Sequence, residues 1–446
     1  MKRKKARIPL PVLALLISIV TPTELSPMIG SLHMLPHRVV ILIFIIPAMM
    51  KLWGGKDRLR AGIYDYLFLL YNVWTTIVFP IHMGFLEGLQ FGGSLAVESW
   101  GGYVIARAYI RDLETFRATV NGLVYTVAFV GLLAIPEGIS GHHFVHEWLR
   151  FLSPLELVVG DEVRWGLTRA YSVFNHPILY GAYCASMLSL LWFSDKAVGP
   201  RIAKAATICI ATFFGLSSAP LNTLLVQSAL GGLHRGTKRF PNRVKILGGF
   251  VLAIYMFLLV SSNQSPIALI VGKISIDPWT AYYRTLIWQY GMDNVWANPM
   301  LGLGLDDWAR PGWMISASVD AFWLLVPMRM GLPALVLLIA AIWTLMAGVH
   351  KYGPRTRIHE AQRAAIGWTL CFTSLALAGL TVHYWDSIHS YIFLVLGMGG
   401  WLANPVKATL KAKKPKAATA AAEAEPQPDP AREQPWIAPW PEPLPA

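Results

Sequence analysis

Two segments of the chain each place an arginine beside residues that suit a phosphate ligand. Arg169 comes shortly before Asn175 and His176, and the proline that follows them suits the first turn of a helix. The free backbone N–H groups of such a turn can bind an anion. Arg284 stands four residues before Trp288, and each guanidinium offers a planar fork that matches phosphate oxygens. If both arginines face one cavity outside the membrane, the pattern predicts a bound diphosphate, the linkage group of lipid-carried sugars.

Each arginine also has a purely structural alternative. Arg169 could extend to the membrane interface, or it could pair with Asp161 or Glu162. The aromatic residues around Arg284 suit the stacking of sugar rings, but aromatic residues are also common at membrane interfaces. The sequence leaves both interpretations open.

The second segment continues into a run that favours a tight turn. Asn298 and a proline are followed by Gly302 and Gly304, residues that permit backbone conformations closed to most others. Such a backbone can approach a ligand closely, or it can simply turn the chain.

Ionisable residues inside apolar helices are costly to bury, so they are candidates for function. The set is Arg38, Asp65, Glu98, Arg107 and Arg329. Arg38 and Asp65 could pair between adjacent helices, and Arg107 could reach the inner headgroups. Glu98 could meet an outer arginine, and Arg329 could stabilise a bound donor from below.

The sequence predicts no metal site. His142, His143 and His146 cluster, but this spacing supplies at most two ligands on one helix face. We interpret them as a solvated or interfacial group. The three cysteines are scattered through predicted helices, and no glycine motif of soluble nucleotide-binding enzymes is present.

The composition is typical of a helical membrane protein. Apolar residues make up 55% of the chain and charged residues 14%, and long apolar runs recur. The net charge of +13 would suggest a nucleic-acid partner in a soluble domain. Here the basic residues lie in short connections between apolar runs, which is the pattern of cytoplasmic loops, so we expect no nucleic acid.

The apolar runs predict an all-α polytopic membrane protein with about twelve transmembrane helices. The expected helices are roughly 8–22, 34–52, 61–82, 94–110, 118–136, 176–194, 203–217, 219–233, 246–262, 321–346, 364–383 and 389–405. With the N-terminus inside, most of the 38 lysines and arginines fall in inner segments, so both termini are expected in the cytoplasm. The basic N-terminus resembles a signal peptide, but no small-residue cleavage site follows it, so the run is expected to remain as the first helix.

Two outer loops, about 137–175 and 263–320, are long enough to predict that they carry function. Residues 1–405 are expected to form one transmembrane domain with these loops on its periplasmic side. The tail, 406–446, is rich in Ala, Glu, Pro and Gln and is expected to be disordered in the cytoplasm. The lysines of 407–416 are expected to contact anionic lipid headgroups.

The order of these motifs resembles one family of membrane enzymes. Arg169-x5-Asn-His-Pro stands at a loop-to-helix junction, and Arg284-x3-Trp is followed by Asn-Pro-x-x-Gly-x-Gly. A later helix contains Gly331-Leu332-Pro333, and a large outer loop separates the ninth and tenth expected helices. Together these features resemble the O-antigen ligase and Wzy-type polymerase superfamily.

This resemblance covers about residues 165–345 and implies a GT-C-like fold with inverting, metal-independent glycosyl transfer and no cofactor. The implied donor is a glycan on undecaprenyl diphosphate, used at the periplasmic face of the bacterial inner membrane. The implied acceptor is a lipid A core, a protein or another lipid-linked glycan. Membrane lipids and other polysaccharide-assembly proteins are further expected partners. By resemblance, Arg169 and Arg284 hold the diphosphate.

The remaining site residues are candidates around that diphosphate. Asn175, His176, Trp288 and Arg329 are candidate substrate-binding residues, and Asp306 lies just after the glycine turn. Arg329 lies about a third of the way into the tenth expected helix.

One departure from the family pattern concerns the general base. Ligases carry a His-Asn pair about eleven residues before the Gly-Leu-Pro element, and Asp320-Ala321 stands there in this chain. A carboxylate can accept a hydroxyl proton, so Asp320 could replace the histidine. His176 and Asp306 are other candidates. A glutamate common two residues before that glycine is Arg329 here.

The missing histidine favours a polymerase of lipid-linked oligosaccharide repeat units in O-antigen or exopolysaccharide synthesis. The alternative within the family is an O-antigen ligase. A transporter or flippase for lipid-linked glycans is the main alternative from another class, because it too would need outer arginines. A membrane subunit that docks other assembly proteins is a third.

Overall fold

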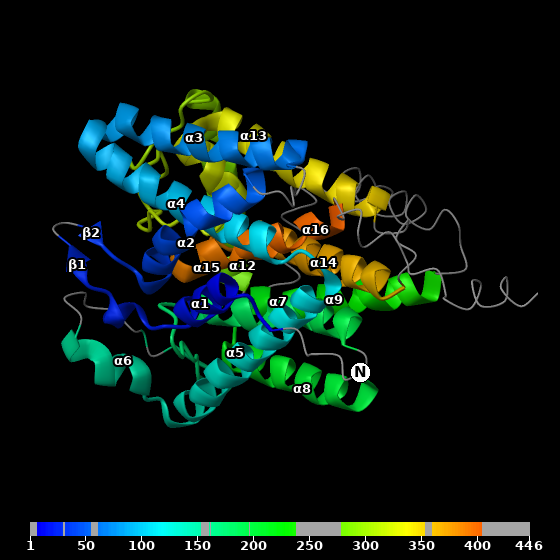
Figure 1. Ribbon diagram of the computed structural model, residues 1–446. Helices are drawn as coiled ribbons and strands as arrows, with labels where there is room; N and C mark the ends of the chain where they lie inside the picture. Colours follow the sequence, from blue (N-terminus) through cyan, green and yellow to red (C-terminus); the bar gives the residue numbers. More distant parts are fainter. Residues whose placement is uncertain are drawn as a thin grey trace, which may run out of the picture. The chain divides into compact units, whose positions relative to one another are not determined.

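The structure is a computed structural model that describes residues 7–29, 32–54, 61–152, 160, 162–195, 197–237, 278–352 and 359–403 (Figure 1). Asp161, the expected helix 246–262, the first part of the expected loop 263–320, and the tail 406–446 lie outside the described residues. The described part is mostly helical.

The longer helices are α1 (Leu10–Ile19), α2 (Pro36–Trp53), α3 (Ile63–Met83), α4 (Phe85–Tyr109), α5 (Leu113–Ser140), α7 (Pro177–Ser194), α8 (Val198–Phe214), α9 (Ser218–Gly236), α12 (Pro278–Ala297), α13 (Phe322–Tyr352), α14 (His359–Ala378) and α15 (Asp386–Met398). The short helical elements are η1 (Thr23–Leu25), α6 (Phe144–Leu149), η2 (Arg150–Leu152) and α16 (Gly400–Ala403). Two small antiparallel hairpins pair β1 (Met28–Ile29) with β2 (Leu32–His33), and β3 (Val163–Arg164) with β4 (Leu167–Thr168).

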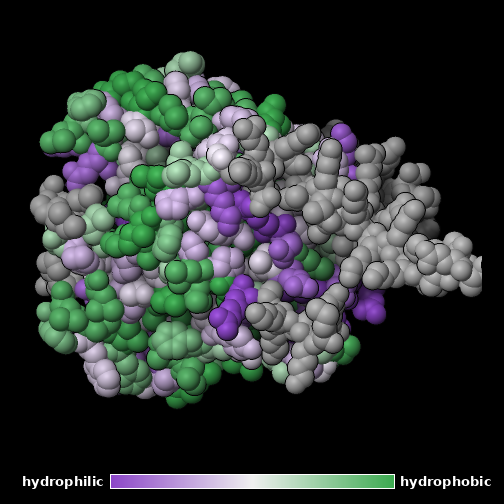
Figure 2. All heavy atoms as spheres, viewed as in Figure 1, coloured by the Kyte–Doolittle hydropathy of each residue, from purple (hydrophilic) through white to green (hydrophobic). Residues whose placement is uncertain are grey.

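Five of the described helices, namely α2, α3, α5, α7 and α13, are long and apolar enough to cross a membrane. α1 is a shorter apolar helix. Large apolar side chains on these helices are exposed, for example Ile46, Leu132 and Trp343. Figure 2 shows broad apolar areas on the viewed face, with polar residues gathered mainly toward its right side. Apolar surface on this scale would be a liability in water and suits a lipid environment, so the fold is consistent with an all-α membrane protein.

Two described helices differ from the sequence-based expectation. α4 begins at Phe85, because Gly84 takes a φ of +85° and reverses the chain directly after α3. α12 lies inside the region expected to be a polar outer loop. Its apolar and polar residues are interspersed, so no apolar run in it reaches the length of a membrane span.

The helices pack in two neighbouring groups, one around α4 and one around α7 (Figure 1). α4 packs against α2, α3 and α15, while α7 packs against α8, α9 and α14. α13 packs along α3 and also contacts α12. Segments far apart in sequence therefore meet around α4, α13 and the start of α15.

A buried ion pair links α3 to α4. Arg107 Nε lies 3.2 Å from Asp65 Oδ1, and neither side chain is exposed. The hydroxyl of Tyr103 donates to the same carboxylate over 2.5 Å, and Arg107 Nη2 donates to the Tyr64 hydroxyl over 3.2 Å. Arg107 therefore does not reach the headgroups, and the partner of Asp65 is Arg107, whereas the sequence suggested Arg38.

α13 is broken at Gly331, which takes φ +77° and ψ +169°. In a continuous helix the carbonyl of Arg329 would accept from residue 333, but Pro333 has no N–H. The freed carbonyls bond elsewhere. The backbone N–H of Leu303 donates to Met328 O over 2.7 Å, and that of Gly304 donates to Arg329 O over 3.0 Å.

Two further hydrogen bonds close the break. Trp74 on α3 donates its indole N–H to Met330 O over 2.8 Å, and Leu332 N donates to Pro299 O over 2.7 Å. Since buried backbone groups without partners are costly, the 298–304 turn and the break in α13 stabilise each other.

Glycine is required on both sides of this contact. A Cβ at Gly331 would lie 2.0 Å from Met300 O. Gly302 takes a φ of +69°, and a Cβ there would lie 2.5 Å from the carbonyl carbon of Arg329. The backbones of the turn and the helix touch directly, which leaves no room for a side chain.

We predict that Gly331→Ala lowers the thermal unfolding midpoint of the detergent-solubilised protein by several degrees. A backbone at φ +77° and ψ +169° is essentially restricted to glycine and costs another residue about 1–3 kcal/mol, and the overlap with Met300 adds to it. Gly232→Ala in α9 is the matched control, because nothing lies within 4 Å of the Cβ position there. Equal midpoints for the two variants would contradict the contact described.

Candidate functional site

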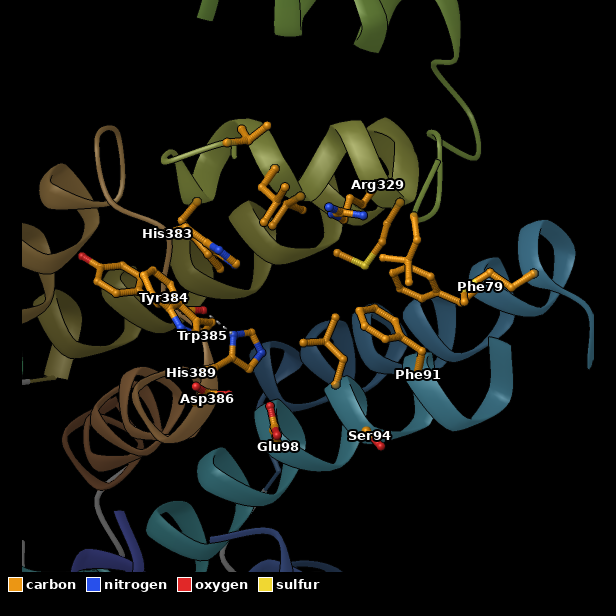
Figure 3. A pocket seen from close by; sticks show the side chains of 18 of the residues that line it. Phe79, Phe91, Ser94, Glu98, Arg329, His383, Tyr384, Trp385, Asp386 and His389 are labelled. Carbon is orange, nitrogen blue, oxygen red and sulfur yellow. Dashed lines mark hydrogen bonds between the residues drawn. The ribbon is translucent and has the colours of Figure 1, made fainter. Parts of the chain in front are cut away.

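A cavity of about 800 Å³ lies between α2, α3, α4, α13 and α15 (Figure 3). The segment before α13, at Ala317–Val319, and the loop before α15, at His383–Trp385, complete its wall. Its size falls in the range of sites for small organic ligands.

The cavity has a polar end and an apolar end. In Figure 3, His383, Asp386 and His389 gather at one end, while Phe79 and Phe91 lie at the other. The lining also includes apolar side chains from α3, α4 and α13, such as Met83, Leu95 and Leu325, and the polar residues Glu87 and Gln90 on α4. This division fits an amphiphilic ligand with a polar head.

Arg329 reaches into the cavity from the last turn before the break in α13 (Figure 3). Its Nη1 donates to Gly304 O over 2.9 Å, so the glycine turn also orients the guanidinium. Within the described residues, the guanidinium makes no other hydrogen bond and has no carboxylate partner. Its remaining N–H groups can therefore serve an anionic ligand.

The second cavity arginine, Arg38, is already neutralised. Its Nε donates to Glu98 Oε1 over 2.5 Å, and His37 Nε2 lies 3.3 Å from the same oxygen. Glu98 thus meets an arginine from the neighbouring α2, whereas an outer-loop arginine was expected. Because this group balances its own charge, Arg329 is the cavity cation that a ligand's negative charge would face.

Asn175 reaches the cavity wall from the first arginine segment. Its Nδ2 donates to Asp386 Oδ2 over 2.5 Å, and its Oδ1 accepts from the Thr23 hydroxyl over 2.6 Å. Asp386 takes a φ of +49°, a conformation that few residues other than glycine adopt. Such local strain is often found at functional sites.

His176 caps the start of α7 beside the cavity. Its Nδ1 accepts from Ile178 N over 3.1 Å, and its ring packs edge-on against Trp385, which lines the cavity, at 5.5 Å between ring centres. Burial and, to a smaller extent, the charge of Arg169 lower the pKa of His176 to about 4, although Asp320 and Glu162 oppose the shift. The imidazole is therefore neutral at neutral pH, and its side chain occupies part of the helix N-terminus proposed for an anion.

Arg169 is buried and bonded within the protein. Its Nη1 donates to Glu162 Oε2, and its Nη2 donates to the Ser217 hydroxyl over 2.6 Å. Of the alternatives left open by the sequence, pairing with Glu162 is the one observed. Arg169 does not contribute to the cavity wall.

The second arginine segment also lies outside the cavity lining. Arg284 is buried on α12, and one turn later the indole N–H of Trp288 donates to Leu380 O over 2.8 Å. Asp306 is exposed, and its backbone N–H donates to Leu303 O over 3.1 Å. The hydrogen bond from Trp288 to Leu380 O fixes α12 to the loop that precedes α15.

Asp320 lies just beside the cavity wall. It is half-buried, and its Oδ1 accepts from the Ser318 hydroxyl over 2.6 Å. Ser318 and Val319 line the cavity, while Asp320 does not. Among the sequence-based candidates, the structure thus places Arg329 in the cavity and Asn175, His176 and Asp320 at its border.

The sequence-based reasoning missed the run His383–His389 at the polar end of the cavity. Five of its seven residues are ionisable or tryptophan residues that line the cavity, namely His383, Tyr384, Trp385, Asp386 and His389. The available signal was this density of polar groups in a short connection between two apolar helices. In the sequence, this run marks only the boundary between two expected spans.

The histidine cluster is buried, contrary to the expectation of a solvated group. His143 Nδ1 bonds Glu137 Oε1 and His146 Nδ1 bonds Glu24 Oε1, and both rings are only 4% exposed. His142 alone stays exposed, beside Glu147. Within the described residues, no group of three or more His, Cys, Asp or Glu side chains is arranged to hold a metal ion.

The fold and the cavity define a helical chain of membrane-protein type with an amphiphilic site between its helices. No model of a known protein family matches the chain, and no curated protein matches it.

We predict that acid destabilises the protein partly through two loop histidines. Burial lowers the pKa of His176 to about 4, and burial together with His389 and Arg329 lowers that of His383 to about 3. The unfolded chain, with an ordinary histidine pKa of about 6.5, binds these protons more readily. Their contribution is therefore fully present above about pH 6.5 and is lost as the pH falls toward 4.

The measurement is the thermal midpoint in detergent between pH 7.5 and 4.5. The double variant His176→Asn/His383→Asn should show a shallower decline than the wild type, whereas the exposed-residue variant His142→Asn should not. A double variant whose midpoints parallel those of the wild type would show that the two histidines are not held neutral.

Proposed function

We propose that the protein transfers a glycan from a polyprenyl-diphosphate donor to an acceptor hydroxyl within this cavity. The specific proposal is polymerisation of undecaprenyl-diphosphate-linked repeat units in O-antigen or exopolysaccharide synthesis. The reaction would take place at the periplasmic face of the bacterial inner membrane. It would invert the anomeric configuration and would need no metal.

The observation that carries the proposal is the pairing of Arg329 with an amphiphilic cavity. A lipid diphosphate carries an anionic head, a sugar on one side and a hydrocarbon chain on the other. Arg329 offers an uncompensated charge, the His383–His389 run offers polar groups for the sugars, and Phe79 and Phe91 offer an apolar wall. A soluble nucleotide sugar has no hydrocarbon chain to pack against the apolar wall of the cavity.

In this proposal Arg169 and Arg284 bind the diphosphate of the donor when the donor enters the cavity. Only the carboxylate side of the ion pair between Arg169 and Glu162 faces solvent, since the Glu162 side chain is 58% exposed and that of Arg169 is 4% exposed, so exchange would proceed by Glu162 turning outward. Arg169 would exchange this carboxylate for the diphosphate. Arg284 would approach from α12, whose Trp288 already contacts the loop before α15.

The chemistry requires stabilisation of the departing diphosphate more than acid catalysis. The anomeric C–O bond breaks with negative charge growing on the phosphate oxygen, while the acceptor oxygen attacks the opposite face of the carbon. Oriented donors in a site that excludes water contribute a few kcal/mol each, roughly 10²–10³ in rate. Asp320, a base candidate from the sequence, lies beside the wall but not in the lining, and the acceptor would enter from that side.

The broken helix α13 also occurs in membrane transporters, where freed backbone groups bind the transported solute. Here the carbonyls of Met328, Arg329 and Met330 are all occupied by Leu303, Gly304 and Trp74. A break whose polar groups are used internally favours a positioning role for Arg329 over a transport site.

Deletion of the gene followed by analysis of surface glycans tests the proposal. Loss of long chains with single repeat units retained on the surface would identify a polymerase. Accumulation of full-length polymer on undecaprenyl diphosphate would identify a ligase. Unchanged surface glycans in the deletion strain would contradict both.

We predict that Arg329→Lys and Arg284→Lys each fail to restore long glycans to the deletion strain, with a loss of roughly 10²-fold or more in transfer rate. Lysine keeps the charge but lacks the planar fork. Arg150→Lys, at an exposed arginine of η2, is the matched control and should restore wild-type glycan. If Arg329→Lys or Arg284→Lys restored surface glycans of normal length, that arginine would not be part of the site.

A further inference from the structure

The loop between α14 and α15 fixes His383 at the cavity from both sides. The residue before it is held because Phe322 N donates to Val382 O over 3.1 Å. The residue after it is held because the Tyr384 hydroxyl donates to Leu375 O over 2.8 Å. The His383 ring packs near that of Trp385, at 5.5 Å between centres. The imidazole is thus positioned by its neighbours rather than by a hydrogen bond of its own.

His383 is the open imidazole of the cavity. Its ring nitrogens make no hydrogen bond to any described residue, and Figure 3 shows the ring directed into the cavity. The other cavity histidine, His389, turns its Nδ1 to Tyr384 O at 3.3 Å, and its Nε2 is buried. Of the cavity carboxylates, Asp386 accepts from Asn175, Glu98 is paired with Arg38, and Glu87 stands on an exposed position of α4, while Asp320 lies outside the lining.

We propose that His383 is the general base of the transfer, and that it becomes an effective base only after the donor diphosphate has bound at Arg329. This inference rests on the proposed function. A ring nitrogen of His383 takes the proton of the acceptor hydroxyl. The acceptor oxygen forms its bond to the anomeric carbon, the bond from that carbon to the phosphate oxygen breaks, and the electron pair leaves with the polyprenyl diphosphate. The proton on His383 is released to water afterwards.

Electrostatics explains why donor binding would control the base. Burial, His389 and Arg329 hold the pKa of His383 at about 3, so the unliganded imidazole binds a proton weakly. A diphosphate that neutralises Arg329 would replace repulsion by attraction and raise this pKa toward the working range of a base. The other charged and titratable groups that line the cavity are Asp386 and His389 on α15, Glu87 and Glu98 on α4, Arg38 on α2, and the hydroxyls of Tyr71 and Tyr384. Arg38 and Glu98 compensate each other, which leaves Arg329 as the charge that the ligand changes.

The donor-free and donor-bound pKa can be measured directly. The full chain, labelled with ¹³C at histidine and held in nanodiscs, is titrated by NMR with and without farnesyl diphosphate. The resonance missing from His383→Gln identifies the residue, and retained binding of farnesyl diphosphate by that variant shows that it is folded. The expected result is a pKa well below that of free histidine in the absence of ligand and a rise of at least about one unit on binding.

The outcomes separate the two proposals. Binding without a change in the His383 pKa would overturn the donor-controlled base and leave the proposed function standing. Absence of farnesyl diphosphate binding to the wild type would overturn the proposed function and this inference with it.

Activity gives the second test, with the lipid-linked repeat unit that the deletion strain accumulates as substrate. His383→Gln should lower kcat by about 10²–10⁴-fold, with little change in KM for the donor, and added imidazole should restore part of the rate. His142→Gln, at an exposed loop histidine, should keep wild-type kinetics. A wild-type pH–rate profile for His383→Gln in a protein that transfers glycan would overturn the assignment.

Discussion

The structure depends on the contact between a glycine turn and a broken helix. The backbone N–H groups of Leu303 and Gly304 satisfy two carbonyls of α13 that the helix itself cannot satisfy. In a segment long and apolar enough to cross a membrane, no water is available to hydrogen-bond these carbonyls instead. The turn therefore cannot move without exposing the helix break, and the break cannot close because Pro333 has no N–H to donate. The consequence is a fixed arginine, since the carbonyl of Gly304 also accepts from the Arg329 side chain.

The cavity combines this fixed cation with groups supplied by other parts of the chain. α4 contributes Glu98, whose charge is balanced by Arg38, and the start of α15 contributes polar and titratable side chains. Asn175 connects that end to the first arginine segment through its hydrogen bond to Asp386. A ligand that fills the space must be anionic near Arg329 and apolar toward Phe79 and Phe91. A lipid-linked phosphate, the ligand that we propose, would meet both requirements.

Much of the fold could be predicted from hydrophobic run length, because helices such as α5 and α13 are long apolar segments bounded by polar residues. α12 could not, since its burial depends on tertiary contacts such as that of Trp288 with the loop before α15. The glycine turn was recognised as special, but its partner across the chain was not evident from composition. Ion-pair partners were the least predictable feature. Asp65 takes Arg107 from the helix that packs on it, and His383 matters only because folding brings it beside Arg329.

The central claim is that one cavity holds both the diphosphate and the start of its lipid chain. Photoaffinity labelling with a prenyl diphosphate that carries a benzophenone in the prenyl chain tests this most directly, with the modified peptides located by mass spectrometry. Labels should fall on α3 and α4 around Phe79 and Phe91, and excess unmodified farnesyl diphosphate should suppress them. Labelling mainly on α8 and α9, which do not line the cavity, would contradict the account.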